Sequence, residues 1–270
     1  DTVLFESYRA GVGDAAPLGP VDAHSLWPLY SATKSYGAAA LLSLAHDDLL
    51  SLDDPVSRLL PQFGADGDGA YEAAGVTLRH LASHTSGVEI PDTTWEGPVT
   101  DLRPVRVIEA PGDTFRYSWQ GMHVLERALQ AAVGADFEDI LRARVLQPMG
   151  LENTRYVYSY DPDLPLLPVR APAGDPESYT LSYRGGRIGS GLYATARDVN
   201  RFGRLWLGDG TYHGERCFNA ALKQEAWTHH GTRASDNGRY GLLWWLFEDE
   251  GGFVMSGAGA KASAVVPATG

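Results

Sequence analysis

The most informative stretch of the chain is Leu29-Tyr30-Ser31-Ala32-Thr33-Lys34-Ser35-Tyr36. It places a hydroxyl and an amine three residues apart at the head of residues 37–45, which carry no charge and are apolar on nearly every side. A segment that is hydrophobic all round predicts a buried helix. Residues three apart share one face of a helix, with Cβ atoms about 5–6 Å apart, so Ser31 and Lys34 are expected to point the same way.

The pairing of Ser31 with Lys34 has two interpretations. A lysine in an apolar setting loses hydration, which lowers the pKa of its amine. The neutral amine can then take the proton of the serine hydroxyl and make that hydroxyl a nucleophile. In the other interpretation Ser31 is only the N-cap of the helix, and Lys34 extends to water. The S-x-x-K spacing alone does not decide between them.

Composition limits the class of protein and its partners. The chain has 270 residues, a formal net charge of -12 and a sequence pI near 5.0. That length can bury a large core, as one domain or as two interleaved lobes. The acidic balance argues against nucleic acid and anionic membranes as partners, because both require a basic surface. No uncharged stretch is long enough to span a bilayer, and a single cysteine, Cys217, excludes an internal disulfide. Neither the compartment, bacterial cytoplasmic or exported, nor the oligomeric state follows from the sequence.

The order of predicted elements indicates an α+β fold. A strand-like N-terminal segment, residues 2–9, precedes the buried helix, and the middle of the chain alternates helices with long loops. The predicted helices include residues 77–87, 121–133, 137–146 and one capped by Thr195, and the later strand candidates are residues 240–247, 252–255 and 262–266. We therefore expect an antiparallel sheet flanked by helices and built from both chain ends. On this division, residues 1–30 and 180–270 form an α/β sheet lobe, and residues 31–179 form a mainly helical lobe with long loops.

Several stretches together resemble the serine β-lactamase and penicillin-binding-protein superfamily, in its class C-like branch. That branch also holds esterases, D-stereospecific peptidases and amidases such as 6-aminohexanoate-dimer hydrolase. The resemblance covers essentially the whole chain, and five stretches in one order are far more specific than any one of them. They are Ser31-Ala32-Thr33-Lys34, Leu50-Ser51-Leu52-Asp53-Asp54-Pro55-Val56, Leu81-Ala82-Ser83-His84-Thr85-Ser86-Gly87, Pro111-Gly112-Asp113-Thr114-Phe115-Arg116-Tyr117-Ser118 and Gly191-Leu192-Tyr193-Ala194-Thr195-Ala196-Arg197-Asp198.

The resemblance implies roles for particular residues. Ser31 would be the nucleophile, Lys34 its activating base, and Tyr117 the tyrosine of the Y-x-N motif. A phenol beside an amine can relay a proton and protonate the leaving group; a core aromatic with a hydrogen-bonded hydroxyl is the structural alternative for Tyr117. The backbone N–H groups of Ser31 and Ala258 would form the oxyanion hole.

Two motif positions depart from the family pattern. Trp119 replaces the asparagine of Y-x-N, and tryptophan can donate one hydrogen bond but accept none. Either another residue holds the lysine, or amide binding is weak, or Trp119 forms an apolar wall for the acyl group. The K-[ST]-G or H-x-G motif is matched by Met255-Ser256-Gly257, so the cation that usually pairs with a substrate carboxylate is missing. Ser256 keeps its hydroxyl, and Gly257 permits close approach of ligand and backbone.

The remaining candidates favour structural roles, and no cofactor or metal is expected. His84 ends a predicted helix. His229 and His230 are adjacent and so diverge in most backbones, without further residues at metal-ligand spacing. No G-x-S-x-G sequence is present, which weakens an α/β-hydrolase interpretation.

The sequence thus predicts a serine hydrolase acting through an acyl-enzyme on a small-molecule ester or small amide, as a carboxylesterase or amidase does. An acyltransferase of the same fold and a catalytically impaired binding protein are the alternatives, and a β-lactamase or D,D-peptidase is less favoured because of Met255. Residues 265–270 read as a strand running into a turn. Because an open sheet edge is an aggregation hazard, we expect that the sequence is incomplete or that a partner chain covers that edge.

Overall fold

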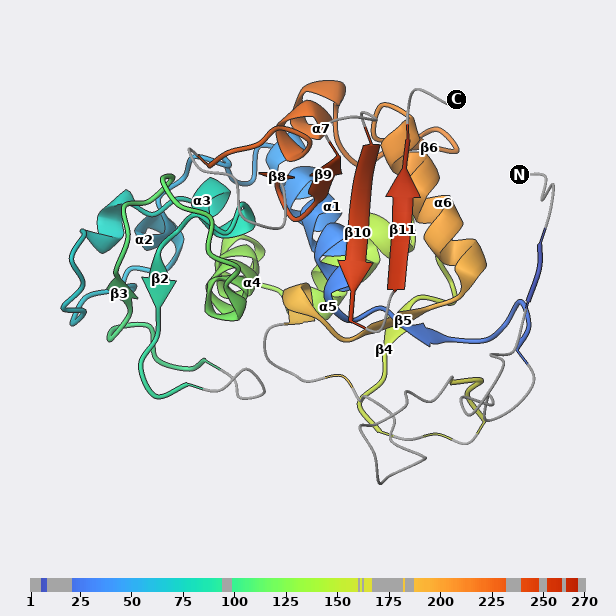
Figure 1. Ribbon diagram of the computed structural model, residues 1–270, viewed down its shortest axis with the longest axis horizontal. Helices are drawn as coiled ribbons and strands as arrows, with labels where there is room; N and C mark the ends of the chain where they lie inside the picture. Colours follow the sequence, from blue (N-terminus) through green and yellow to red (C-terminus); the bar gives the residue numbers. More distant parts are fainter. Residues whose placement is uncertain are drawn as a thin grey trace.

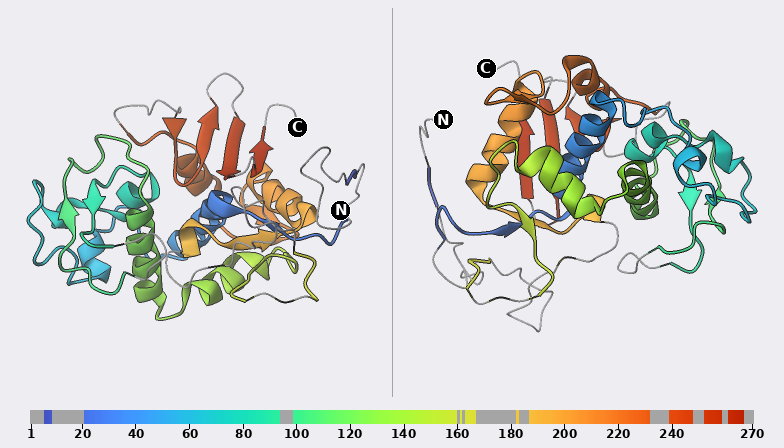
Figure 2. Two further views of the ribbon diagram at one scale, coloured as in Figure 1. Left: turned by 60° about the horizontal axis from the view of Figure 1, so that its bottom comes forward. Right: turned by 180° about the vertical axis from the view of Figure 1, so that it is seen from behind.

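The protein is described by a computed structural model, which covers residues 6–8, 21–93, 99–159, 161, 163–166, 182, 187–231, 239–247, 252–258 and 261–266. The fold is α+β, as predicted, with an antiparallel four-stranded sheet in the order β11-β10-β9-β8 and helices packed against it (Figure 1). In the view from behind in Figure 2, helices α1, α5 and α6 lie across the sheet. Among the described residues, no helix is both long and apolar enough to cross a membrane.

The helical segments are spread along the chain. They are the 3-10 turns η1 (Tyr30–Ala32), η2 (Ala73–Gly75) and η4 (Arg187–Gly189), the helices α1 (Thr33–His46), α2 (Val56–Leu59), α3 (Leu78–Ala82), α4 (Trp119–Val133), α5 (Phe137–Leu141), α6 (Ala196–Leu207) and α7 (Ala220–Ala226), and the π-helical turn η3 (Arg142–Leu146).

The strands belong to four antiparallel groups. The main sheet contains β8 (Arg239–Tyr240), β9 (Trp245–Phe247), β10 (Gly252–Gly257) and β11 (Lys261–Val265), a smaller sheet contains β1 (Trp27–Pro28), β5 (Leu192–Ala194) and β4 (Arg155–Tyr156), and two hairpins are β2 (Val88–Glu89) with β3 (Arg106–Val107) and β6 (Thr211–Tyr212) with β7 (Glu215–Arg216).

Helix α1 is the centre of the core, as its apolar sequence predicts. Every residue from Thr33 to Leu44 is buried. The ring of Tyr36 stacks on Phe202 of α6 with centroids 3.8 Å apart, and the helix also contacts α5, α7, β10 and the turn η4. A helix packed on all sides cannot shift without disturbing the whole core, so the residues at its N-terminus are held firmly.

Local signals predicted helix starts well. Thr77 and Thr195 cap α3 and α6, and each side-chain oxygen accepts a backbone N–H of the first turn.

Residues 240–247 were expected as one strand, but the structure splits them into β8 and β9. Leu243 between them has φ 61° and is buried together with Trp244, so the apolar run turns into the core and does not extend the sheet.

Some predicted elements differ from the structure, and others fall outside the described residues. The predicted N-terminal strand falls mostly outside the described residues, and residues 6–8 are not in a strand. The predicted loop 88–110 contains the β2–β3 hairpin, and α7 was not predicted. The division into a sheet lobe and a helical lobe stays a prediction.

Strand β10 ends directly against the start of turn η1. A Cβ atom placed on Gly257 would lie 2.1 Å from the carbonyl oxygen of Leu29 and 3.2 Å from Cβ of Tyr30. No side chain fits there, and the contact is with backbone, which cannot swing away. Gly257 therefore sets the distance between β10 and η1.

We predict that Gly257→Ala lowers the free energy of unfolding by about 1–3 kcal/mol, the usual cost of forcing an extra carbon into a packed region. Gly75→Ala is the matched control, because a Cβ there meets nothing within 4 Å. Urea denaturation of both variants checks this, and equal midpoints would show that β10 does not press on η1.

Candidate active site

Ser31 lies in the turn η1, directly before helix α1. The preceding residue, Tyr30, has φ 49°, a conformation that costs a non-glycine residue about 1–3 kcal/mol and is frequent at active sites. The N–H of Ala32 donates to the carbonyl of Leu29 at 3.0 Å. The strained turn presents Ser31 half-buried at the head of the helix.

Lys34 lies one helical turn after Ser31 and is only 5% exposed. Its Nζ is 3.2 Å from Ser31 Oγ and donates to the carbonyl of Gly189 at 2.7 Å. Nζ also lies 4.8 Å from the ring centroid of Tyr117. The amine is therefore enclosed between a hydroxyl, a backbone carbonyl and an aromatic ring.

Burial lowers the pKa of the Lys34 amine, although the neighbouring Tyr117 phenol works in the opposite direction. A charged ammonium loses its hydration inside the protein, and this loss outweighs the interaction with the Tyr117 phenol. The site can therefore supply a neutral amine beside a hydroxyl. Chemically, this is a base within reach of a proton that a nucleophile must lose.

Tyr117 faces Lys34 and also reaches the molecular surface. It is 43% exposed, and its ring stacks near that of Trp245 in β9, with centroids 6.4 Å apart. Tyr117 is thus not buried in the core, and its ring lies between Lys34 and the molecular surface.

His84 holds the segment of Tyr117 from both sides. Its carbonyl accepts the N–H of Arg116 at 2.7 Å, and its Nδ1 accepts the N–H of Ser118 at 3.2 Å. The imidazole ring packs 4.5 Å from that of Tyr117, centroid to centroid. His84 has φ 56° and is 1% exposed. These contacts agree with the structural role expected for His84 from the sequence. They show that His84 holds the backbone on both sides of Tyr117.

The third predicted component is the end of strand β10. Met255 and Ser256 pair with Ser263 and Ala262 of β11, and Gly257 is pressed against Leu29. Ala258 follows as an exposed turn residue. Ala258 therefore follows directly on the residue that packs against η1, and the oxyanion hole built from Ser31 and Ala258 stays a prediction.

The two unusual residues of the motifs have the following surroundings, and the role of Trp119 in substrate binding stays a prediction. Trp119 begins helix α4, and its indole ring packs edge-on against His123 with centroids 5.5 Å apart. Met255 is 3% exposed and belongs to the hydrophobic core. The second acceptor of the lysine is the Gly189 carbonyl, which the sequence reasoning missed. No pattern in the sequence around Gly189 signals this role.

The other sequence candidates stay apart from Ser31. His229 Nδ1 lies 3.1 Å from the carbonyl oxygen of Tyr240, and His230 Nε2 lies near that of Glu225. Within the described ranges no group of histidine, cysteine and acidic residues could hold a metal ion. Cys217 is buried.

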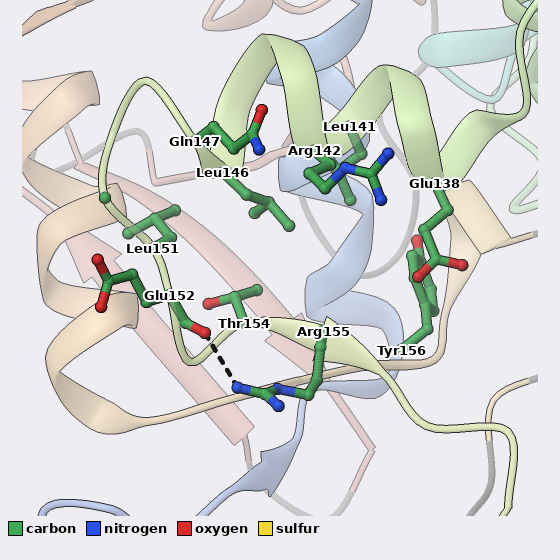
Figure 3. Close-up of a pocket in the computed structure, with 11 residues that line it drawn as sticks. Glu138, Leu141, Arg142, Leu146, Gln147, Leu151, Glu152, Thr154, Arg155 and Tyr156 are labelled. Atoms are coloured by element: carbon green, nitrogen blue, oxygen red, sulfur yellow. Dashed lines mark hydrogen bonds between the residues drawn. The ribbon is translucent and has the colours of Figure 1, made fainter.

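Two cavities of about 500 Å³ are present among the described residues. One, of about 510 Å³, is lined by side chains from α5, η3, β4 and the segment before β4, including Glu138, Thr154 and Tyr156 (Figure 3). The other, of about 480 Å³, is lined by Leu29, Ala32 and Met255 among others. Neither is lined by Ser31, Lys34 or Tyr117, so the reactive groups lie outside both.

Fold and site together define an α+β protein with a serine–lysine pair at the head of its central helix. The chain belongs to the Beta-lactamase family, whose family model matches residues 1–270. This is a family of serine hydrolases that includes esterases and D-alanyl-D-alanine carboxypeptidases.

Three similar proteins illustrate the range of the family. Penicillin-binding protein 4 of Amycolatopsis lactamdurans is 31% identical over 221 residues, covering 74% of this chain and 56% of the relative. Esterase EstB of Burkholderia gladioli is 26% identical over 286 residues, covering 88% of this chain and 71% of the esterase. The structure of EstCE1, a hydrolase with promiscuous acyltransferase activity, is 22% identical with a TM-score of 0.70 and covers 92% of this chain and 78% of that one. The chain spans between 56% and 62% of the length of several curated relatives.

The buried state of His84 makes a prediction about stability and pH. Burial, followed by the charge of Lys34, holds the pKa of this imidazole well below its usual value. The unfolded chain therefore binds a proton near pH 6.5 that the folded protein does not, and stability falls as the pH drops below 6.5. Each such proton contributes a slope of about 1.4 kcal/mol per pH unit.

We predict that His84→Gln, whose amide oxygen can still accept the Ser118 N–H, reduces this slope by up to about 1.4 kcal/mol per pH unit between pH 6 and 5. Urea unfolding at several pH values measures it, with His24→Gln at an exposed position as the matched substitution. An unchanged slope in His84→Gln would contradict a neutral, buried His84.

Proposed function

We propose that this chain is a serine hydrolase that forms an acyl-enzyme on Ser31. The observation that supports it most is the pair formed by a nearly buried amine and a hydroxyl, with Lys34 Nζ 3.2 Å from Ser31 Oγ. Burial lowers the pKa of the Lys34 amine, and a lower pKa makes a lysine a better general base because more of it is neutral at a given pH. The family membership supports the same reaction class.

In the proposed reaction, the neutral Lys34 amine accepts the proton of Ser31 Oγ as this oxygen attacks the substrate carbonyl. The backbone N–H groups of Ser31 and Ala258 stabilise the negative charge that develops on the carbonyl oxygen. Tyr117 then passes a proton to the leaving alcohol or amine, which departs as the C–O or C–N bond breaks. Water attacks the acyl-enzyme by the reverse route and regenerates Ser31.

The proposed substrates are uncharged esters or small amides. Met255 offers no charge to a substrate carboxylate, and its burial places apolar surface beneath the motif. The rings of Tyr117 and Trp245 add an aromatic wall beside Lys34. A peptidoglycan peptide or a β-lactam carries a carboxylate, which this arrangement does not attract.

An acyltransferase is the second candidate. Its specific support is the structural neighbour EstCE1, described as a hydrolase with promiscuous acyltransferase activity, and the exposure of Tyr117, which leaves room for an acceptor alcohol. A binding protein with impaired turnover is the remaining alternative, and it predicts neither labelling nor hydrolysis.

We predict that a fluorophosphonate probe labels Ser31 and that Ser31→Ala abolishes both labelling and hydrolysis of p-nitrophenyl esters, by at least about 10³-fold. Lys34→Met is expected to reduce hydrolysis by about 10²–10⁴-fold. Ser35→Ala and Lys223→Met are the matched controls, and activity retained in Ser31→Ala would refute the mechanism. Labelling without hydrolysis in water, but with ester formation on adding an alcohol, would identify the acyltransferase.

The rate of labelling is expected to rise with pH as Lys34 loses its proton. Because burial lowers the pKa of this amine, the midpoint should fall below the value of about 10.4 for an exposed lysine. A midpoint at or above that value would show that Lys34 is not the base.

Acyl preference is tested by comparing p-nitrophenyl esters of neutral acyl groups with esters whose acyl group carries a carboxylate. We expect kcat/KM to be at least about tenfold higher for the neutral series, since a factor of ten requires only about 1.4 kcal/mol. Equal values, or hydrolysis of a β-lactam at a comparable rate, would contradict the proposed substrate class.

A further inference from the structure

The Gly189 carbonyl that accepts from Lys34 belongs to a very short element. Turn η4 has three residues, Arg187–Gly189, which is too few to fix its own position. A Cβ on Gly189 would lie 3.3 Å from Cβ of Met122 and 3.8 Å from Lys34 Nζ. The backbone thus approaches the amine where a side chain would crowd both neighbours.

Turn η4 is also seated on helix α1. A Cβ on Gly37 would lie 2.3 Å from Cγ1 of Ile188, so the absent side chain of this glycine lets the turn approach the helix closely. The contact between Gly37 and Ile188 sets how closely η4 packs on α1, but it does not set the direction in which the carbonyl groups of η4 point. The orientation of the Gly189 carbonyl must come from other groups.

Helix α4 supplies the first of these groups. Glu126, 4% exposed, accepts the N–H of Ile188 at 3.1 Å through Oε2. Its other oxygen accepts Nε of Arg187 at 3.3 Å. One carboxylate therefore binds the backbone of Ile188 and the side chain of Arg187, two consecutive residues of η4.

Arg187 extends the connection to helix α5 and strand β4. Its two terminal nitrogens donate to the carboxylate of Asp136 at 2.5 and 2.8 Å, and Asp136 also caps α5 by accepting the N–H of Glu138. The carbonyl of Arg187 accepts from the hydroxyl of Tyr156 at 2.8 Å. The turn is thus fixed by three elements.

A buried ion pair contributes little to stability once the cost of desolvation is included. Its directional bonds do fix geometry, and here they fix the peptide between Arg187 and Ile188, which belongs to the same three-residue turn as the Gly189 carbonyl. We propose that Glu126 and Arg187 are positioning residues that orient the Gly189 carbonyl, so that it holds the Lys34 amine against Ser31 Oγ. This inference rests on the proposed function of Lys34 as a base.

The geometry explains why orientation matters for a neutral amine. Such an amine has two N–H bonds and one lone pair. When one N–H donates to Gly189, rotation about the Cε–Nζ bond is restricted, and the lone pair can face the hydroxyl of Ser31. If η4 moves, the amine rotates freely and the fraction of molecules with the lone pair on Ser31 falls.

The chain allows a direct measurement, because it contains only three lysines, Lys34, Lys223 and Lys261. Protein labelled with ¹³C at lysine Cε gives three signals, and Lys34→Arg assigns one of them. The midpoint of the Lys34 titration then reports on its surroundings. The Gly189 carbonyl favours the charged form of the amine, so loss of this contact lowers the midpoint.

Two variants separate positioning from charge. Glu126→Gln loses one acceptor and a negative charge, and both effects lower the Lys34 midpoint. Arg187→Gln removes a positive charge. If charge alone mattered, this loss would raise the Lys34 midpoint or leave it unchanged. If Arg187 positions the Gly189 carbonyl, loss of that contact lowers the Lys34 midpoint. We expect both variants to lower the midpoint by about 0.5–1 pH unit and kcat by roughly tenfold, with KM within twofold.

Asp198→Asn is the matched control. Asp198 is fully buried and its carboxylate accepts the N–H of Asn153 at 2.8 Å, so this substitution is the same kind of change as Glu126→Gln at a different backbone segment. It is expected to lower the melting temperature while the Lys34 midpoint and kcat stay at wild-type values. Thermal melting of all variants shows that each one is folded.

The outcomes are distinguishable. Wild-type protein that neither labels at Ser31 nor turns over would overturn the proposed function. Active wild-type protein whose Arg187→Gln variant raises or keeps the Lys34 midpoint would overturn the positioning role alone. Equal losses of kcat in Glu126→Gln and Asp198→Asn would also overturn it, because general loosening of the core would then be sufficient.

Discussion

The site depends on one amine that is buried without a counter-ion. Lys34 is 5% exposed, and its hydrogen-bond partners are the hydroxyl of Ser31, the carbonyl of Gly189 and the phenol of Tyr117. An adjacent carboxylate would keep the amine protonated and unable to act as a base. The carboxylates of Glu126 and Asp136 both bind Arg187. The protein thus supports turn η4 with a buried ion pair whose carboxylates bind Arg187 and not Lys34.

Three residues with strained backbone conformations lie in segments near Lys34 and Tyr117. Tyr30, His84 and Leu243 all have positive φ values, and each belongs to a segment that approaches helix α1 or Tyr117. Leu243 accepts the buried hydroxyl of Ser35 through its carbonyl at 3.0 Å, and its N–H donates to Ala82. Such conformations persist only where surrounding packing determines them. The fully buried α1 provides that packing, so the core and the strained turns support each other.

The parts of this arrangement that could be predicted from the sequence are local in the chain. The buried helix, the caps at Thr77 and Thr195, and the placement of Ser31 beside Lys34 follow from patterns within one or two helical turns. The two-residue strands have too few residues to show any periodicity. Gly189 lies 155 residues from Lys34, and nothing in a glycine-rich segment identifies which carbonyl will face an amine. Contacts of that kind depend on packing alone.

The two departures from the family motifs therefore affect different functions. Trp119 packs against His123 and takes no part in holding the lysine, yet the lysine is held, because the Gly189 carbonyl accepts its N–H. Met255 removes a charge from the end of β10 but leaves Gly257 and the adjoining backbone in place. On the proposed mechanism, the groups that activate the hydroxyl are retained and the groups that recognise a charged substrate are replaced. Substrate preference can then change among relatives of this fold while the serine–lysine pair stays constant, since the two sets of residues share no hydrogen bond that the structure records.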